Sequence, residues 1–227
     1  MAKLIITIDG PAGSGKSTTA KLLAEKIGAA FLDTGAMYRA VTLAAMQKQI
    51  DLNDIRPLEK LIDNTDFKFE ISNNRMIVEI NGKDVTEQIR EPLVTENVHF
   101  IASVPSLRNR LVQMQQNFAE KYQKAVTEGR DQGTIAFPNA NYKFFLTADA
   151  AQRAKRRAKE LAEKGHKIDL NKLQQEIEKR DADDKNRDAG PLVPAKDAIC
   201  IDNTNLTLEQ TVDKILNFIK SNDQKNH

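Results

Sequence analysis

An α/β fold, with a five-stranded parallel sheet between layers of helices, is the architecture that this sequence predicts. Short apolar runs rich in β-branched residues alternate with stretches of helical periodicity, which is typical of parallel strands joined by helical crossovers. The five predicted strands are residues 3–9, 29–32, 125–128, 142–147 and 198–201. Hairpin signals interrupt this alternation once, and a later stretch is highly charged. We therefore expect a small antiparallel insert and a short helical lid beside the main sheet.

The composition is that of one globular domain spanning residues 1–227. Its residues are 40% hydrophobic and 29% charged, and the chain is long enough to bury a core. A net charge of +2 favours neither nucleic acid nor an anionic membrane as the main partner, and no apolar run approaches membrane-spanning length. The single cysteine, Cys200, lies between Ile199 and Ile201, which predicts a buried, unreactive thiol in a reducing compartment. We expect a cytoplasmic protein, and a monomer because no unexplained apolar stripe is present.

The first elements follow in order from their residue patterns. Residues 3–9 form an apolar, β-rich run bounded by glycine, as expected of a strand buried on both faces. Over residues 17–27 the apolar side chains fall on one helical face, and Gly28 stands at the position of a C-terminal cap. The pattern therefore predicts a strand, a loop and a helix in succession.

The antiparallel insert is predicted over residues 66–100. Its turns are indicated by Ser72-Asn73-Asn74 and by Asn81-Gly82, which are hairpin signals. Its three predicted strands are residues 67–71, 76–80 and 83–86. These short strands favour a small sheet separate from the parallel one.

Helices are predicted on both sides of the later strands. Residues 106–123 carry apolar side chains at helical spacing, so they form a helix that packs on the core. Residues 150–188 are charged and helical in pattern, with an interruption near Gly165, and they contain a basic run at 153–167. We expect this stretch to be the lid with its flanking helices.

The strongest motif is the segment Gly10-Pro11-Ala12-Gly13-Ser14-Gly15-Lys16-Ser17. It matches G-x-x-x-x-G-K-[ST], in which glycines let backbone N–H groups turn inward around phosphate oxygens. We expect Lys16 to bridge the β- and γ-phosphates of ATP, the Ser17 hydroxyl to be a Mg²⁺ ligand completed by waters, and Thr18 to complete the nucleotide contacts. The alternative is a glycine-rich turn without a ligand. The position of the motif between an apolar strand and an amphipathic helix favours nucleotide binding in a P-loop NTPase-type three-layer fold.

The phosphate loop alone does not distinguish a kinase from a GTPase or a motor. The chain has no guanine-reading N-K-x-D element, and it has no repeats or long extensions of the kind that motors carry. Of these classes of P-loop protein, the sequence therefore favours a kinase for a small molecule.

Further motifs make a family resemblance specific. Asp33-Thr34-Gly35-Ala36-Met37-Tyr38-Arg39 follows the second predicted strand, at the sheet edge where open α/β folds bind ligands. Gly129-Arg130-Asp131 and Arg180-Asp181-x-x-Asp184-x-x-Arg187 follow later in the chain. In order and spacing these motifs resemble bacterial cytidylate kinase over nearly the whole chain. The resemblance implies transfer of the γ-phosphate of ATP to CMP or dCMP.

The resemblance also implies roles for individual residues. The family holds its acceptor phosphate with arginines, which here would be Arg39, Arg130 and Arg187. A planar guanidinium matches phosphate oxygens bidentately. Arg108 and Asp131 match the family's base-reading pair, because cytosine needs both a donor and an acceptor. The remaining acceptor-site positions are Thr34, Tyr38, Arg180 and Asp184, the last two at the ribose. The alternatives are surface salt bridges for the arginines and an i,i+4 helix pair for Arg180 and Asp184.

Three positions depart from the family pattern. His99 stands where a base-reading serine is expected, and it is either a substrate contact or an exposed or capping histidine. Gln132 replaces a small or apolar residue, and Gln116 stands where an arginine is common. We expect the last two to alter affinity without changing the reaction.

The lid and the phosphate loop together suggest a mechanism of in-line transfer. Arg153, Arg156 and Arg157 share one face of a helix whose packed side carries Ala154, Ala158 and Leu161. Closing the lid would bring Arg153 and Arg157 to the transferring phosphoryl group, with Lys16 and Mg²⁺, while Arg130 and Arg187 align the attacking phosphate. A solvated basic face is the alternative. No general base is required, because the acceptor phosphate is already largely dianionic.

Two further alternatives remain open. Asp33 is expected either to orient a metal-bound water or to cap the turn at Thr34-Gly35. The chain as a whole is alternatively a kinase for another monophosphate or a metabolite, which would not need Arg108 and Asp131 to converge on a base. A nucleotide-dependent RNA-binding protein that uses the basic run at 153–167 is the alternative from a different class.

Overall fold

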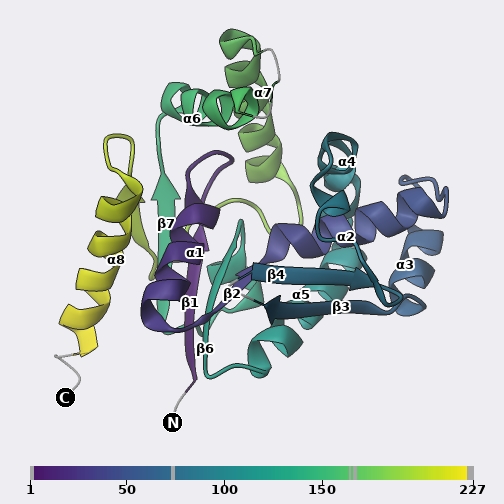
Figure 1. The fold of residues 1–227 in the computed structure, drawn as a ribbon, viewed down its shortest axis with the longest axis horizontal. Helices are drawn as coiled ribbons and strands as arrows, with labels where there is room; N and C mark the ends of the chain where they lie inside the picture. The colour runs from purple at the N-terminus through teal and green to yellow at the C-terminus, as the bar shows by residue number, and fades with distance from the viewer. Residues whose placement is uncertain (1–2, 73–74, 164, 166–167, 224–227) are drawn as a thin grey trace.

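A parallel sheet forms the centre of the molecule in the computed structural model, which describes residues 3–72, 75–163, 165 and 168–223 (Figure 1). The strand order is β2-β6-β1-β7-β8, and every neighbouring pair is parallel. The strands are β1 (Leu4–Asp9), β2 (Ala30–Asp33), β6 (Lys124–Gly129), β7 (Tyr142–Thr147) and β8 (Ile199–Asp202). All five predicted strands are confirmed. Because they run in parallel, the carboxyl ends of β1, β2 and β6 meet at one edge.

Helices cover both faces of this sheet and give the fold three layers. On one face α1 (Lys16–Ile27) and α8 (Leu208–Asp223) pack over a core that includes Ile6, Ile8 and Phe144. On the other face a second core joins Leu32 and Ala125 to α2 (Thr34–Gln47), α3 (Ile55–Asp63) and α5 (Pro105–Glu120). Strand side chains alternate between the two cores, as Ala125 and Val126 do, because successive residues of a strand point to opposite faces. The predicted cap at Gly28 is confirmed by its left-handed φ of 63°.

The insert is antiparallel, as predicted, and packs against α2. It comprises β3 (Phe67–Ser72), β4 (Arg75–Ile80) and β5 (Lys83–Asp84), followed by the short helix η1 (Gln88–Arg90) and α4 (Pro92–Ala102). Asn81 and Gly82 both have positive φ, which is the geometry that this hairpin dipeptide favours. Of the other predicted turn, Asn73 and Asn74 lie outside the described residues. The insert extends to one side of the parallel sheet in Figure 1.

The lid region consists of α6 (Ala150–Ala162) and α7 (Leu170–Asn186), which pack against each other. Figure 1 shows both helices beyond the carboxyl ends of the strands, above the loop between β1 and α1. The predicted interruption is confirmed at Gly165, whose φ is +82°. Within the predicted basic run, Lys164, His166 and Lys167 lie outside the described residues.

Two local features differ from expectation. Cys200 is exposed rather than buried, because β8 is an edge strand that turns Ile201 into the core and Cys200 away from it. Residues Gln132–Ala136 form a π-helical turn that the sequence did not predict. Within the described parts of the chain, no helix is both long and apolar enough to cross a membrane.

Candidate active site

The predicted phosphate loop joins β1 to α1 at the carboxyl edge of the sheet. Gly10 has a φ of +154°, and a Cβ at this position would clash with the carbonyl oxygen of Leu146. Gly13 has a φ of +73° and lies against the backbone of Arg153. Both positions therefore need glycine, for backbone conformation and for close packing. The Ser14 hydroxyl is buried in the loop without a hydrogen-bond partner among the described residues, so the loop retains an unused polar atom.

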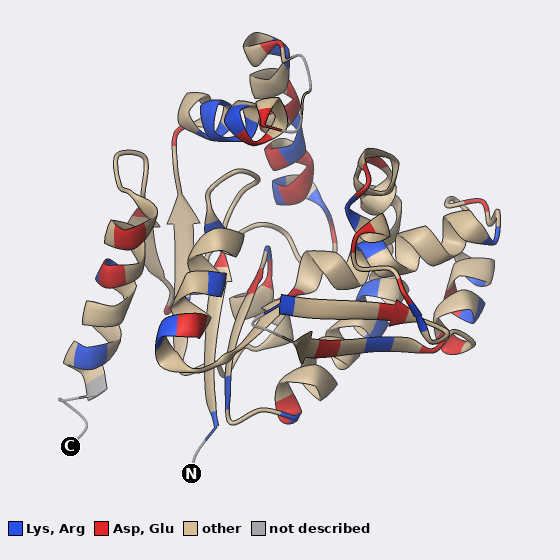
Figure 2. Ribbon diagram, viewed as in Figure 1, with Lys and Arg blue, Asp and Glu red and all other residues tan. Residues whose placement is uncertain are grey.

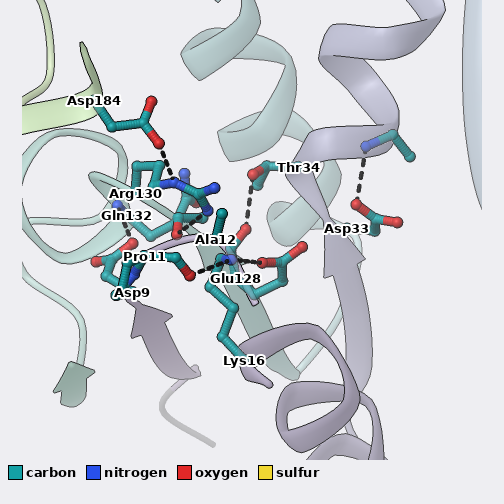
Figure 3. Close-up of polar contacts among 12 residues, drawn as sticks. Asp9, Pro11, Ala12, Lys16, Asp33, Thr34, Glu128, Arg130, Gln132 and Asp184 are labelled. Atoms are coloured by element: carbon teal, nitrogen blue, oxygen red, sulfur yellow. Dashed lines mark hydrogen bonds and ion pairs between the residues drawn. The ribbon is translucent and has the colours of Figure 1, made fainter. Parts of the chain in front are cut away.

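Lys16 is buried at the start of α1 and faces the end of β6 (Figure 3). Its Nζ donates to the Pro11 carbonyl oxygen at 3.3 Å and lies 3.9 Å from Oε2 of Glu128. Burial, and then the positive charge of Arg130, lower the pKa of Lys16 from 10.5 to about 7, although Glu128 opposes this shift. A phosphate group beside Lys16 would favour its charged form.

Glu128 is the residue that sequence reasoning missed at this edge. It is buried at the carboxyl end of β6, the strand that pairs with β1, and burial raises the pKa of its carboxyl group. The positive charge of Lys16 and, more weakly, the Ser17 hydroxyl oppose this rise. An acidic residue at the end of an apolar strand beside the phosphate-loop strand was the available signal, because P-loop enzymes use such a carboxylate in holding Mg²⁺.

The donor set of Ser17 and Glu128 fits magnesium. Both supply hard oxygen atoms, and Mg²⁺ is commonly bound by one or two carboxylates together with substrate phosphates and water. Ser17, the last residue of the phosphate-loop motif, is exposed in the first turn of α1.

Asp33 lies at the end of β2 and caps α2. Its Oδ1 accepts from the Ala36 N–H at 2.9 Å, which is the capping alternative considered for this residue. Its carboxylate also pairs with Arg39 at 3.4 Å and with Arg90 at 3.0 Å. Burial alone would raise the pKa of Asp33, but the two arginines outweigh it and the pKa is lowered. Arg90, from η1 of the insert, was not among the predicted residues.

Two of the three predicted acceptor arginines, Arg130 and Arg187, pair with Asp184, whereas Arg39 pairs with Asp33. Arg130 Nε lies 2.6 Å from Asp184 Oδ2, and Arg187 Nη1 lies 3.4 Å from Asp184 Oδ1. Arg180 makes no ion pair with Asp184, so the i,i+4 helix pair is not formed in this structure, and none of the described contacts gives Arg180 another partner. Arg39 Nε and Arg187 Nη2 are buried without hydrogen-bond partners among the described residues. These unused donors make the cluster suitable for a polyanionic oxygen group.

The predicted base-reading residues do converge. Arg108 and Asp131 form a buried ion pair, and Arg108 Nη1 donates to the Ala102 carbonyl oxygen at 2.9 Å. The Arg108 guanidinium also lies 5.5 Å from the centre of the Tyr38 ring, within the range of a cation–π interaction. Gly190 covers the pair so closely that a Cβ would overlap both charged groups. Thr34 lies nearby on α2 and donates its hydroxyl to the Glu128 carbonyl oxygen at 2.7 Å.

The three departures from the family pattern have separate local explanations. His99 is exposed on α4, as in the exposed alternative, with Nδ1 2.7 Å from the Glu96 carbonyl oxygen and its ring against Phe100. Gln132 turns its amide into the core, where it bonds Thr127 and Gln115. Gln116 donates to the Ala136 carbonyl oxygen at 2.8 Å. The two glutamines thus hold the end of β6 and the π-helical turn at Gln132–Ala136 in place.

The lid arginines differ in exposure, so the alternative of a solvated basic face does not apply to Arg153. Arg153 is buried and bonds the Ala12 carbonyl oxygen at 2.9 Å and Asp181 at 2.6 Å, because the first turn of α6 packs directly on the phosphate loop. Arg157 pairs instead with Glu160 one turn further along. Figure 2 shows the basic residues crowded on α6 above this loop. The structure therefore brings Arg153, but not Arg157, into contact with the phosphate loop.

Asp9 is a second residue that sequence reasoning missed as part of the site. Its carboxylate accepts the backbone N–H groups of Gln132 and Gly133 at 2.9 and 2.8 Å and so holds the turn after Asp131 (Figure 3). Burial raises the pKa of Asp9 to about 6, although these two hydrogen bonds oppose the shift.

The fold and the site define a P-loop phosphotransferase, because a phosphate loop on a parallel sheet lies near an arginine cluster and below a helical lid. A model of the family described as cytidylate kinase matches residues 6–221. The chain belongs to the cytidylate kinase family, which confirms the resemblance inferred from its motifs.

Individual relatives agree with this assignment. A protein named cytidylate kinase from Clostridium botulinum (strain Langeland / NCTC 10281 / Type F) is 49% identical over 220 residues, covering 97% of this chain and 99% of that protein. One from Caldicellulosiruptor saccharolyticus is 45% identical over 216 residues, covering 95% of each. The crystal structure of an uncharacterized protein from Eubacterium ventriosum ATCC 27560 matches with a TM-score of 0.53 at 15% identity, over 96% of this chain and 99% of that one. This last likeness shows the fold alone.

Proposed function

We propose that the protein transfers the γ-phosphoryl group of ATP to CMP or dCMP, giving ADP and the corresponding diphosphate. The observation that carries this proposal is the convergence of Arg108 and Asp131 under Gly190, whose carbonyl oxygen accepts a hydrogen bond from Arg187 of the arginine cluster. A metabolite kinase would need no such pair, whereas cytosine presents both donor and acceptor atoms. Family membership supports the same reaction.

The acceptor phosphate is held by arginines. Arg39, Arg130 and Arg187 surround Asp33 and Asp184, and two of their buried nitrogen atoms lack partners. A bidentate guanidinium and phosphate pair would use these donors. Arg180, with Asp184, is assigned to the ribose hydroxyls.

The acceptor base is read by the buried pair beside these arginines. Arg108 donates and Asp131 accepts, with Tyr38 packed against the guanidinium. Thr34 completes the acceptor site from α2. His99, on the exposed face of α4, is assigned a contact at the edge of the base only.

The phosphate loop binds the phosphate donor, ATP. Residues 10–18 bind the triphosphate, with Lys16 on its β- and γ-phosphates. Ser17 and Glu128 are the residues that would hold Mg²⁺, with Asp33 as an outer partner, and the metal supplies neutralisation of charge on the phosphates. Arg153 and, after lid closure, Arg157 stabilise charge on the group in transfer. Transfer then depends on alignment, because the acceptor oxygen needs no deprotonation.

The setting that we propose is a cytoplasmic monomer without a nucleic-acid or membrane partner. One domain spans residues 1–227, residues 66–100 form the monophosphate-binding insert, and residues 150–188 form the lid with its flanking helices. The near-neutral net charge of +2 and the single cysteine support this setting.

A panel of acceptors tests the reaction and the base choice together. ADP release from Mg-ATP is measured with CMP, dCMP, UMP, AMP, GMP and dTMP in parallel. We expect CMP and dCMP to give the highest kcat/KM, and Lys16→Ala to reduce kcat by about a hundredfold or more because it removes a charge that stabilises the transferring group. Lys21→Ala, an exposed lysine on the same helix, is the matched control and should retain activity.

Other outcomes of the panel separate the alternatives. Preferred turnover of a different monophosphate would keep the mechanism and discard the base assignment. An absence of turnover on every acceptor would remove nucleotide kinase activity, and salt-sensitive retention on RNA would then favour the RNA-binding alternative.

A further inference from the structure

Asn203 occupies a junction between the phosphate loop, the sheet and the lid. It lies directly after β8, is 3% exposed, and its backbone N–H donates to the Thr147 carbonyl oxygen at the end of β7. Its side-chain Nδ2 donates to the Ser14 carbonyl oxygen at 2.8 Å. On the opposite side, Arg156 of α6 donates to Asn203 Oδ1 at 3.1 Å and to its carbonyl oxygen at 2.7 Å. A single amide thus bonds the phosphate loop and the basic helix together.

The partners fix which way this amide faces. A backbone carbonyl can only accept a hydrogen bond and a guanidinium can only donate, so Nδ2 must face Ser14 and Oδ1 must face Arg156. No other orientation satisfies both partners. An aspartate at position 203 would keep the bond from Arg156 but would have no donor for Ser14.

The bond to Ser14 has a consequence for the neighbouring peptide. In a planar trans peptide the carbonyl oxygen and the following N–H point in opposite directions, and no cis peptide occurs in the described chain. Holding the Ser14 carbonyl toward Asn203 therefore turns the Gly15 N–H the other way, toward the inside of the phosphate loop. None of the described hydrogen bonds takes up the Gly15 N–H, so it is available to an anion.

The same amide adjoins the cavity beside the phosphate loop. Gly13, Gly15, Arg156 and Asn203 all line this cavity. Asn203 contacts the loop at a carbonyl oxygen, away from the atoms that would bind phosphate, so it acts on the phosphates only through the loop backbone.

We propose that Asn203 is a positioning residue for the donor nucleotide, which fixes the Ser14–Gly15 peptide so that the Gly15 N–H binds the triphosphate. The bond from Arg156 holds the amide in this orientation and makes it depend on the placement of α6. This inference rests on the proposed function only in taking ATP as the ligand of the loop.

The test compares ligands that share the phosphates but differ elsewhere. Binding of ATP, tripolyphosphate and CMP is measured by isothermal titration calorimetry for the wild type, Asn203→Asp and Asn203→Ala. We expect both variants to bind ATP and tripolyphosphate about tenfold more weakly, because the loop carbonyl loses its buried donor, while CMP affinity changes less than about twofold. In steady state the defect should appear in the KM for ATP and not in the KM for CMP.

Controls and contrary outcomes are defined by the same titrations. Asn205→Asp makes the same chemical change at an exposed position two residues away and should bind all three ligands as the wild type does. Weaker ATP binding with unchanged tripolyphosphate binding would overturn the proposal in favour of a contact with the nucleoside. An equal loss of CMP affinity, or no loss of any affinity, would also overturn it. Should Asn203→Asp fail to fold, Asn203→Ala decides.

A failure of the proposed function would give a different result from a failure of this inference. The wild type would then bind tripolyphosphate but show no turnover of CMP, and the comparison between the Asn203 variants would be unaffected.

Discussion

Lys16 occupies an environment that favours its uncharged form in the absence of a nucleotide. Its side chain is buried, Arg130 adds a repulsive positive charge, and Glu128 compensates from 3.9 Å. The folded protein therefore binds fewer protons than the unfolded chain between about pH 7, the folded pKa, and 10.5, the ordinary one. The stability contributed by this residue accordingly rises with pH across that window.

Binding of ATP should reverse the shift in the pKa of Lys16, because the phosphates stabilise the ammonium form. We predict uptake of about one proton when ATP binds at pH 8 and much less uptake at pH 6, where Lys16 is already charged. Calorimetry in two buffers with different ionisation enthalpies measures this uptake. Lys16→Arg is the control, because arginine stays charged at both pH values and should show no such uptake. Equal uptake by the wild type and Lys16→Arg would contradict the assignment.

Single residues differ in how far sequence predicted their positions. The phosphate-loop residues were predicted because motif spacing constrains them directly, whereas the pair of Arg108 and Asp131 was predicted from the family resemblance. Glu128 and Asp9 were missed because their role depends on which strands are neighbours, and a local pattern does not specify this. Arg153 and Arg157 were both predicted to reach the transferring group; in this structure Arg153 contacts the loop and Arg157 pairs with Glu160.

The turn after α7 connects the lid to the proposed acceptor site. Leu192 N donates to the Asp184 carbonyl oxygen at 2.8 Å, and Arg187 Nε donates to the Gly190 carbonyl oxygen at 2.5 Å. Gly190 has a φ of +61° and lies directly over Arg108 and Asp131. One short segment thus contains the end of the lid helix, one proposed acceptor arginine and the glycine that lies over the proposed base-reading pair.

Gly190→Ala tests whether this turn shapes the base site. We predict a loss of about 1 kcal/mol in the free energy of unfolding from the positive φ, together with a clear rise in the KM for CMP from the overlap with Asp131. Gly28→Ala is a matched control, because Gly28 has a φ of +63° but no atom within 4 Å of an added Cβ. It should lose similar stability and keep the KM for CMP. A similar KM in both variants would show that the turn does not influence the base site.

Elements were predicted well where local chemistry decides them. The Asn81-Gly82 hairpin and the Gly28 cap formed because both need backbone conformations that few other residues adopt. The π-helical turn at Gln132–Ala136 was not predicted, since Asp9 stabilises it from another strand. Cys200 was misplaced because its exposure depends on β8 being an edge strand.

At the scale of the whole molecule, the candidate active-site residues lie together at one edge of the sheet. The carboxyl ends of β1, β2 and β6 bring together the phosphate loop, Asp33 and Glu128. The insert and α2 lie on one side of this edge, and α6 and α7 extend beyond it (Figure 1). This arrangement places the phosphate loop and Arg130, one of the proposed acceptor arginines, at the same edge of the sheet, as in-line transfer requires.

Transfer of label is the most direct measurement of the central claim. ATP carrying ³²P in the γ position is incubated with CMP and Mg²⁺, and the nucleotides and inorganic phosphate are separated. The account predicts that the label appears in CDP in an amount equal to the ADP formed, and that Lys16→Ala forms neither. Label recovered as inorganic phosphate without CDP would contradict the account, because the protein would then be hydrolysing ATP rather than phosphorylating CMP.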